Sequence, residues 1–220
     1  MKSRNYAGIS LLASLAACNS ATAETVQKNS TQAPQKPNVI VILADDLGYG
    51  DLKCYGAKNV ETPHVDKLAS EGIRFTNAHT VAATSTPSRY SLLTGEYAWR
   101  RPDTDIAAGD VKMIIRPEQY TMADMFKSAG YATAAIGKWH LTPSEATSAA
   151  GPYDRWPLGR GFERYYGFLG GDTHQYYPEL VRDNMQVEPE KTPEEGYHLT
   201  PDLVEKAKAM IADAKQVAPD

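Results

Sequence analysis

The feature that most constrains the fold is a continuous apolar run at residues 38–44, Asn-Val-Ile-Val-Ile-Leu-Ala. The run carries no charge and is mostly β-branched, as are strands buried on both faces of a parallel sheet. It ends abruptly at Asp45 and Asp46. Because ligands of such sheets bind beyond the carboxyl ends of the strands, we expect these two aspartates at a functional site.

Helix and strand signals alternate along the chain after this run. Thr62 and Pro63 supply an N-cap and a first-turn proline, and Gly72 supplies a stop, which predicts a helix between them. The other expected elements are helices over 85–95, 121–130 and 200–216 and short strands over 73–77 and 131–136. This alternation predicts an α/β fold with a mostly parallel sheet flanked by helices.

Residues 142–196 are rich in Pro, Gly and aromatic residues and show no clear period. We expect long loops here that line a pocket. Trp156 and the pair Tyr176-Tyr177 would suit stacking on a sugar or aryl ring, with packing inside the protein as the alternative.

Length and charge exclude some classes of function. A chain of 220 residues with 42% hydrophobic content can build one core of ordinary size. The 27 acidic and 23 basic residues give a net charge of −4, and no basic stripe with interleaved aromatics is present. Nucleic acid is therefore not an expected partner.

The amino terminus has the pattern of an export signal. Lys2 and Arg4 precede an apolar run over 6–17 that is too short for a membrane-spanning helix, which predicts a signal peptide over 1–17. Leu15-Ala16-Ala17-Cys18 resembles the lipobox of bacterial lipoproteins, in which Cys18 would carry the lipid; the alternative cleavage site is Ala21-Thr22-Ala23. We expect an exported protein of the periplasm, outer membrane or cell surface, attached to membrane through the lipid anchor alone.

Residues 18–36 are rich in Ser, Thr, Gln, Ala and Pro, which predicts a disordered tether before a folded domain over 37–220. Once Cys18 is lipidated or removed, Cys54 has no partner, so no disulfide is expected.

The segment that starts at Ser85 combines a hydroxyl and, one helical turn later, the guanidinium of Arg89 at the start of a short helix. Lys138 and His140 follow the strand expected over 131–136, so both are expected near the aspartates at 45 and 46. Carboxylates are the ligands that calcium prefers, and a divalent cation lowers the pKa of a hydroxyl bound to it. The positive side chains of Arg89 and Lys138 would hold an anion, and His140 would move a proton. Each motif alone also fits a helix cap or a surface turn.

One family has these residues at this spacing. Ser85-x-Pro87-Ser88-Arg89 followed by Leu93-Thr94-Gly95 resembles the sulfatase signature. The likeness extends over about 37–216 through segments in the same order, namely 38–50, 62–66, 137–140, 161–162 and 166–168. The resemblance implies the alkaline-phosphatase-like α/β fold and a chain that corresponds to the amino-terminal part of a sulfatase.

The resemblance also implies roles for residues. Ser85 would be oxidised to formylglycine by a radical maturase, and the hydrated aldehyde would attack the sulfur of a sulfate ester on a calcium ion held by Asp45, Asp46 and residue 85. Arg89, Lys138 and His140 would be catalytic, and Lys138 and His140 would also bind the sulfate. His174 would contact substrate or be an ordinary loop histidine.

Sulfatases are normally longer and carry, in the part that follows, a second Asp-Asn or Asp-His metal pair, another histidine and another lysine. Two alternatives to an active sulfatase stay open: a truncated, inactive or partner-dependent lipoprotein fragment, and a phosphomonoesterase or phosphonate hydrolase of the same fold that uses an unmodified Ser85. The expected substrate is a sulfated small molecule or glycan. Aryl and carbohydrate sulfates both fit, with a preference for carbohydrate sulfate in an exported bacterial lipoprotein.

Overall fold

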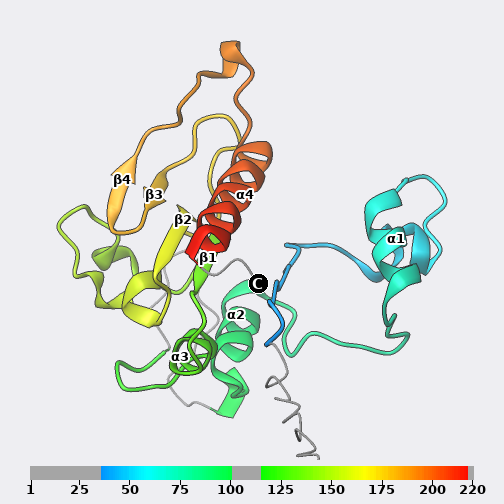
Figure 1. Cartoon of the computed structure of the whole chain (residues 1–220), viewed down its shortest axis with the longest axis horizontal. Coiled ribbons are helices and arrows are strands. Elements are labelled where there is room, and N and C mark those ends of the chain that lie inside the picture. Colours follow the sequence, from blue (N-terminus) through cyan, green and yellow to red (C-terminus); the bar gives the residue numbers. More distant parts are fainter. Residues whose placement is uncertain (1–35, 101–114, 218–220) are drawn as a thin grey trace, which may run out of the picture. The chain divides into compact units, whose positions relative to one another are not determined.

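The computed structural model describes residues 36–100 and 115–217 (Figure 1). The signal peptide expected over 1–17, the lipidation site Cys18 and nearly all of the 18–36 tether lie outside these residues and stay predictions. The chain up to Ile40 is one unit, of which residues 36–40 carry no helix or strand, and the chain from Val41 is a second unit. Within the described ranges, no helix combines the length and the hydropathy that crossing a membrane requires.

The second unit contains a four-stranded sheet in the order β1 (Ala134–Lys138), β2 (Arg164–Phe168), β3 (Leu180–Arg182) and β4 (Met185–Val187). The β1 and β2 strands are parallel, whereas β2 with β3 and β3 with β4 are antiparallel. The α/β class is confirmed, but the described sheet is mixed rather than mostly parallel. A short connection explains the β3–β4 pair, since these strands are joined by two residues and only antiparallel strands can be joined so tightly.

The helices lie close to their expected positions. They are α1 (Pro63–Glu71), α2 (Ser85–Thr94), α3 (Met122–Ser128) and α4 (Leu199–Val217). Thr121 Oγ1 accepts a hydrogen bond from the Asp124 amide while the Asp124 carboxylate accepts one from the Thr121 amide, which is a capping box. Short 3-10 helices lie at Tyr49–Asp51, Lys53–Tyr55, Ala98–Arg100, Ser144–Ala146, Tyr153–Arg155, Pro157–Arg160 and Pro193–Glu195.

Two expected strands are absent, and three strands were not expected. Residues 38–44 and 73–77 carry no strand, and Ile42 is 84% exposed. An apolar run becomes a strand only when a neighbour supplies its hydrogen bonds, and no described strand pairs with these residues. Residues 142–196, expected as loops, contain β2, β3 and β4, and the strand expected over 131–136 begins three residues later, at Ala134.

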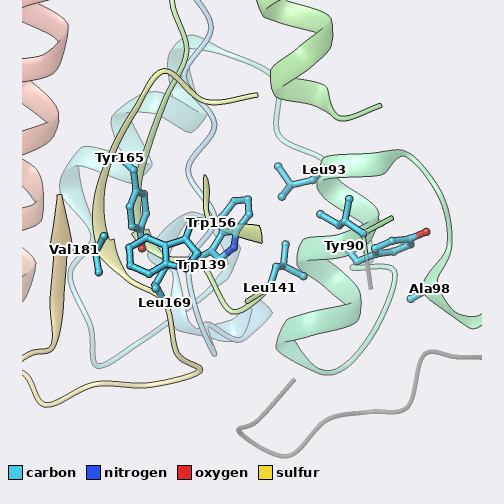
Figure 2. Packing of buried hydrophobic residues seen from close by; sticks show 10 residues of the cluster. Tyr90, Leu93, Ala98, Trp139, Leu141, Trp156, Tyr165, Leu169 and Val181 are labelled. Carbon is cyan, nitrogen blue, oxygen red and sulfur yellow. The ribbon is translucent and has the colours of Figure 1, made fainter. Parts of the chain in front are cut away.

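The central strand β2 is buried on both faces. Tyr165 packs with Trp139, Leu141 and Trp156 in one cluster (Figure 2), whereas Tyr166 belongs to a second cluster. The second cluster lies between the sheet and α4, which packs on β1 and β2 (Figure 1) and contributes buried residues Leu199 and Met210.

Trp156 is a packing residue and not a stacking platform. Its side chain is fully buried, and its indole Nε1 donates to the Ala146 carbonyl at 2.7 Å. The Tyr176-Tyr177 pair, in contrast, is exposed.

Candidate active site

The α2 helix places Ser85 and Arg89 side by side. Thr86, Tyr90 and Leu93 recur at helical spacing and are buried, so they turn one face of α2 toward the core. Ser85 and Arg89 are four residues apart and therefore lie along one adjacent line of the helix. Arg89 Nε donates to Ser85 Oγ at 2.9 Å.

The chain beyond β1 brings His140 to the same hydroxyl. The backbone amide of Trp139 donates to the carbonyl of Phe168, the last residue of β2, at 3.0 Å, and that of His140 donates to the Leu169 carbonyl just after β2, at 3.1 Å. The pairing with β2 therefore continues past the end of β1. Trp139 and Leu141 are buried in the cluster of Figure 2, and the residues that alternate with them, Lys138 and His140, contact the site instead. His140 Nδ1 lies 3.0 Å from Ser85 Oγ.

Asp45 joins this group through its two carboxylate oxygens. Lys138 Nζ donates to Oδ2 at 2.9 Å, and Arg89 Nη2 donates to Oδ1 at 3.3 Å. Arg89 Nη1 also donates to the Lys138 carbonyl at 2.8 Å. The structure thus brings together five of the residues that the sequence singled out, from three separate segments of the chain.

Asp46 and His174 are not part of this hydrogen-bonded group in the described structure. Asp46 is exposed and has a left-handed backbone, with φ at 56°. His174 is exposed, and its Nδ1 accepts hydrogen bonds from the amides of Tyr176 and Tyr177, each at 3.1 Å. Their expected roles as a metal ligand and a substrate contact stay predictions.

The surroundings lower the pKa of both the base, His140, and the acid, Asp45. Burial lowers the pKa of His140, and the positive charges of Lys138 and Arg89 lower it further against the weaker opposing effect of Asp45 and Asp172. Burial would raise the pKa of Asp45, but the hydrogen bond and charge of Lys138, with Arg89, outweigh burial and lower it. His140 is therefore neutral and Asp45 ionised at neutral pH.

The hydrogen-bond directions follow from these charge states. Arg89 Nε–H can only donate, so Ser85 Oγ accepts there and has its own proton left to donate. A neutral imidazole can accept that proton at Nδ1. Ser85 and His140 thus have the geometry of a nucleophile and its base, beside two cations that would hold an anion.

The family follows from the whole pattern of the chain. The model of the Sulfatase family matches residues 37–219. This chain belongs to the Sulfatase family. The residues of the site described above all lie within the matched range.

Individual sulfatases resemble the chain over part of their length. The N-acetylgalactosamine-6-O-sulfatase of Bacteroides thetaiotaomicron is 57% identical over 130 residues, which cover 59% of this chain and 25% of that protein. The steryl-sulfatase of Mus musculus is 44% identical over 144 residues, which cover 61% of this chain and 22% of that enzyme. The chain spans about a quarter of the length of the curated relatives it matches.

Solved structures confirm the sulfatase fold. A Bacteroides thetaiotaomicron protein from a study of glycosaminoglycan metabolism is 48% identical with a TM-score of 0.60, over 70% of this chain and 32% of that one. Ps i-CgsB, solved in complex with k-i-k-neocarrahexaose, is 28% identical with a TM-score of 0.70, over 82% of this chain and 42% of that one.

The oxygen donors of the site fit calcium in kind but not in number. Asp45, Asp46 and Ser85 offer the hard oxygen atoms that calcium prefers, but calcium takes about six to eight of them. Both oxygens of Asp45 are already held by Lys138 and Arg89, and the described ranges contain no group of three or more acidic, histidine or cysteine side chains placed for a metal. The described residues alone do not form a calcium site.

Three residues that support the sulfatase site were not singled out from the sequence. The Tyr165 hydroxyl is buried 2.9 Å from the carbonyls of both Gly137 and Phe168, which braces the end of β1. Thr86 Oγ1 donates to the His140 carbonyl at 3.4 Å, and Gly171 packs against the His140 ring. Thr86 lies inside the signature at its variable position; Tyr165 and Gly171 carry no signal in a single sequence.

Proposed function

We propose that this sulfatase hydrolyses sulfate esters and that residue 85 is the position from which the ester is attacked. The observation that carries the proposal is the double contact of Ser85 Oγ, 2.9 Å from Arg89 Nε and 3.0 Å from His140 Nδ1. One neighbour is a fixed cation and the other a neutral base, so the hydroxyl can lose a proton where negative charge is stabilised.

The remaining side chains have complementary tasks in this proposal. Lys138 and Arg89 would bind sulfate oxygens, with Arg89 as a planar fork and Lys138 as a point charge. The free N–H groups at the start of α2 would face the same anion. The ion pairs with Asp45 hold the two cations in place before substrate arrives.

We propose that a radical maturase converts Ser85 to formylglycine, whose hydrated aldehyde supplies the attacking hydroxyl. The family membership and the serine at position 85 support this. Oxidation of the hydroxyl removes two hydrogens, so the peptide that contains residue 85 should be about 2 Da lighter than its sequence predicts. Mass spectrometry of protein from the native host tests this, and an unmodified peptide from active protein would contradict it.

We propose calcium as the metal of the whole protein, with Asp45, Asp46 and residue 85 as three of its ligands. The oxygen chemistry of these side chains supports calcium, and the other ligands would come from residues outside this set. Chelation should lower the melting temperature of the protein purified with its metal, and calcium should restore the melting temperature. A melting temperature indifferent to both treatments would contradict the proposal.

The proposed substrate is a carbohydrate sulfate. The relatives support this, since one is named as an N-acetylgalactosamine-6-O-sulfatase and another structure holds a neocarrahexaose. The exposed rings of His174, Tyr176 and Tyr177 form a group with the half-buried His198, with neighbouring centroids 5.1 to 6.1 Å apart, which would suit a sugar face.

Loss of this ring group tests the substrate class. The Tyr177→Ala variant should raise KM for a sulfated oligosaccharide several-fold and leave hydrolysis of a small aryl sulfate unchanged. The exposed Tyr153, which lies in the 3-10 helix Tyr153–Arg155, provides a control as Tyr153→Phe. Equal effects on both substrates would contradict a carbohydrate platform.

Export and lipid attachment at Cys18 are proposed from the sequence alone, together with the signal peptide over 1–17 and the tether over 18–36. The Cys18→Ala variant should lose incorporation of labelled fatty acid and leave the membrane fraction. Retention of label on this variant would contradict anchoring at Cys18.

Matched esters separate the proposed reaction from phosphate chemistry. Protein purified from the native host should release sulfate from an aryl sulfate much faster than phosphate from the same aryl phosphate. Faster phosphate release would instead indicate a phosphomonoesterase that uses the unmodified Ser85 hydroxyl, and release of neither product would favour the inactive fragment.

A further inference from the structure

One edge of the His140 ring has no polar partner. Nδ1 faces Ser85 Oγ at 3.0 Å, but Nε2 is buried and makes no hydrogen bond to any described residue. The whole residue is 8% exposed, so solvent does not reach Nε2 either. No hydrogen bond from this side fixes the ring, and its position depends on packing.

The packing partner at that edge is Gly171. A Cβ atom at this position would lie 2.7 Å from Nε2 and 2.8 Å from Cε1 of His140. Both distances are far below the 3.5 to 4.0 Å of an ordinary contact. Gly171 is not among the residues with positive φ, so its backbone does not demand glycine. Position 171 requires glycine only because the His140 ring occupies the space that a side chain would fill.

We propose that Gly171 is a positioning residue for the proposed sulfatase reaction, because its missing side chain leaves the space in which the His140 ring reaches Ser85. This inference rests on the proposed function, because the experiment measures sulfate-ester hydrolysis. The packing of Gly171 against His140 supports it independently of that function. It assigns the loop after β2 a part in the chemistry, although the described hydrogen bonds of Ser85 Oγ are to Arg89 and His140 and not to that loop.

The geometry also says which partner would yield to a larger residue. The segment before Gly171 is fixed, because Leu169 is buried in the core and its carbonyl accepts from the His140 amide at 3.1 Å. The imidazole is the end of a side chain, held by one hydrogen bond to Ser85. A methyl group at 171 should therefore push the ring by about 1 Å and leave the backbone in place.

Gly170 provides the matched control in the same loop. Its φ is also not positive, and a Cβ there would meet only the Asp172 carbonyl, at 3.3 Å, and no atom of the site. Both variants add one methyl group to the same turn, but only Gly171→Ala meets His140. The comparison therefore isolates displacement of the ring.

The experiment measures sulfate-ester hydrolysis and melting temperature of the whole protein as wild type, Gly171→Ala, Gly170→Ala, His140→Ala and the double variant Gly171→Ala/His140→Ala. Gly171→Ala should lower kcat by about 10- to 100-fold with a melting temperature close to wild type, since a 1 Å misplacement has an effect of this size. Gly170→Ala should keep kcat within about threefold of wild type. In the His140→Ala background, Gly171→Ala should change nothing further, because the clashing ring is gone.

Three other outcomes would count for or against the inference. Equal kcat values for Gly171→Ala and Gly170→Ala, or the same loss from Gly171→Ala with and without His140, would show that the ring is not the partner. If Gly171→Ala fails to fold, the double variant decides, because restored folding supports the clash with His140 and continued unfolding shows that the loop itself needs glycine. An inactive wild type would instead refute the proposed function.

Discussion

Arg89 is the residue with the most connections in the site. Its three nitrogens donate to Ser85 Oγ at 2.9 Å, to the Lys138 carbonyl at 2.8 Å and to Asp45 Oδ1 at 3.3 Å. Burial lowers the pKa of Arg89, and the charge of Asp45 opposes this shift. Only a planar fork reaches three partners in these directions, so the residue joins α2, the end of β1 and the segment at Asp45.

The Arg89→Lys variant should lose most of the activity although it keeps the charge. A single ammonium cannot replace three directed donors, and loss of one preorganised donor lowers kcat by about 10²- to 10³-fold. Steady-state kinetics on an aryl sulfate measure this, with Arg164→Lys as a control, since Arg164 forms an exposed ion pair with Asp213. A kcat within threefold of wild type would refute the assignment of three roles to Arg89.

The pKa of His140 should respond to Lys138. Burial, Lys138 and Arg89 lower this pKa below the ordinary value of about 6.5, so Lys138→Gln should raise it again. NMR titration of the imidazole resonances, assigned with His140→Gln, measures the shift. In Lys127→Gln, which removes an exposed lysine paired with Glu163, the pKa should stay as in wild type.

The sign of the pH effect on stability follows from the same shift. Between the lowered pKa of folded His140 and about 6.5, the unfolded chain binds more protons than the folded one. His140 therefore destabilises the fold as pH falls through this window and has no such effect above it. The acid-induced loss of stability should be smaller in Lys138→Gln, and a larger loss would contradict the assigned cause.

Sequence reasoning reached the residues of the site but not all of its contacts. Helical spacing predicts that Ser85 and Arg89 share a face, and the strand end predicts Lys138 and His140 nearby. The orientation of the His140 ring, with Nδ1 toward Ser85 and Nε2 toward Gly171, depends on packing between distant segments, and spacing along a chain carries no information on that.

At the scale of elements, the contact between β1 and β2 is unusually close. Gly137 pairs with Gly167 in the parallel register, and a Cβ at position 167 would lie 2.0 Å from the Gly137 carbonyl oxygen. The atoms that such a Cβ would meet belong to the backbone, which cannot move aside as a flexible side chain can. The two strands could not keep this spacing with any other residue at 167.

The Gly167→Ala variant should therefore be destabilised by at least the 1 to 3 kcal/mol or so typical of overpacking. Unfolding in urea, followed by circular dichroism, measures the free energy of unfolding. Gly50→Ala is the control, because a Cβ there meets nothing within 4 Å. Similar free energies of unfolding for Gly167→Ala and Gly50→Ala would show that β1 and β2 can move apart without loss of stability.

Helix ends were predictable because single residues determine them, whereas among the described strands the sequence predicted β1 alone, three residues early. Thr121 with Asp124 and the left-handed Gly95 mark the ends of α3 and α2 where the sequence predicts them. The β2 strand lacks an alternating pattern because it is buried on both faces, and it lies in a segment rich in glycine and proline. The run over 38–44 has the composition of a strand, but no described strand pairs with it.

At the scale of the whole molecule, three segments remote in sequence meet at one site. Asp45 is 44 residues from Arg89, which is 49 residues from Lys138, and each pair is joined by a hydrogen bond. The family membership predicts this convergence, because the signature motifs follow one another in the order of the Sulfatase family. Composition and length alone would have indicated only a globular protein.

The proposed reaction depends most directly on residue 85, and sulfate release by matched serine variants tests this dependence. Ser91 is the control, since it lies in the same helix and its buried hydroxyl has no hydrogen-bond partner among the described residues. Protein from the native host should release sulfate from a sulfated saccharide as wild type and as Ser91→Ala, and Ser85→Ala should lose at least about 10³-fold in rate. If Ser85→Ala released sulfate as fast as Ser91→Ala, residue 85 would not be the reaction centre and the account would be wrong.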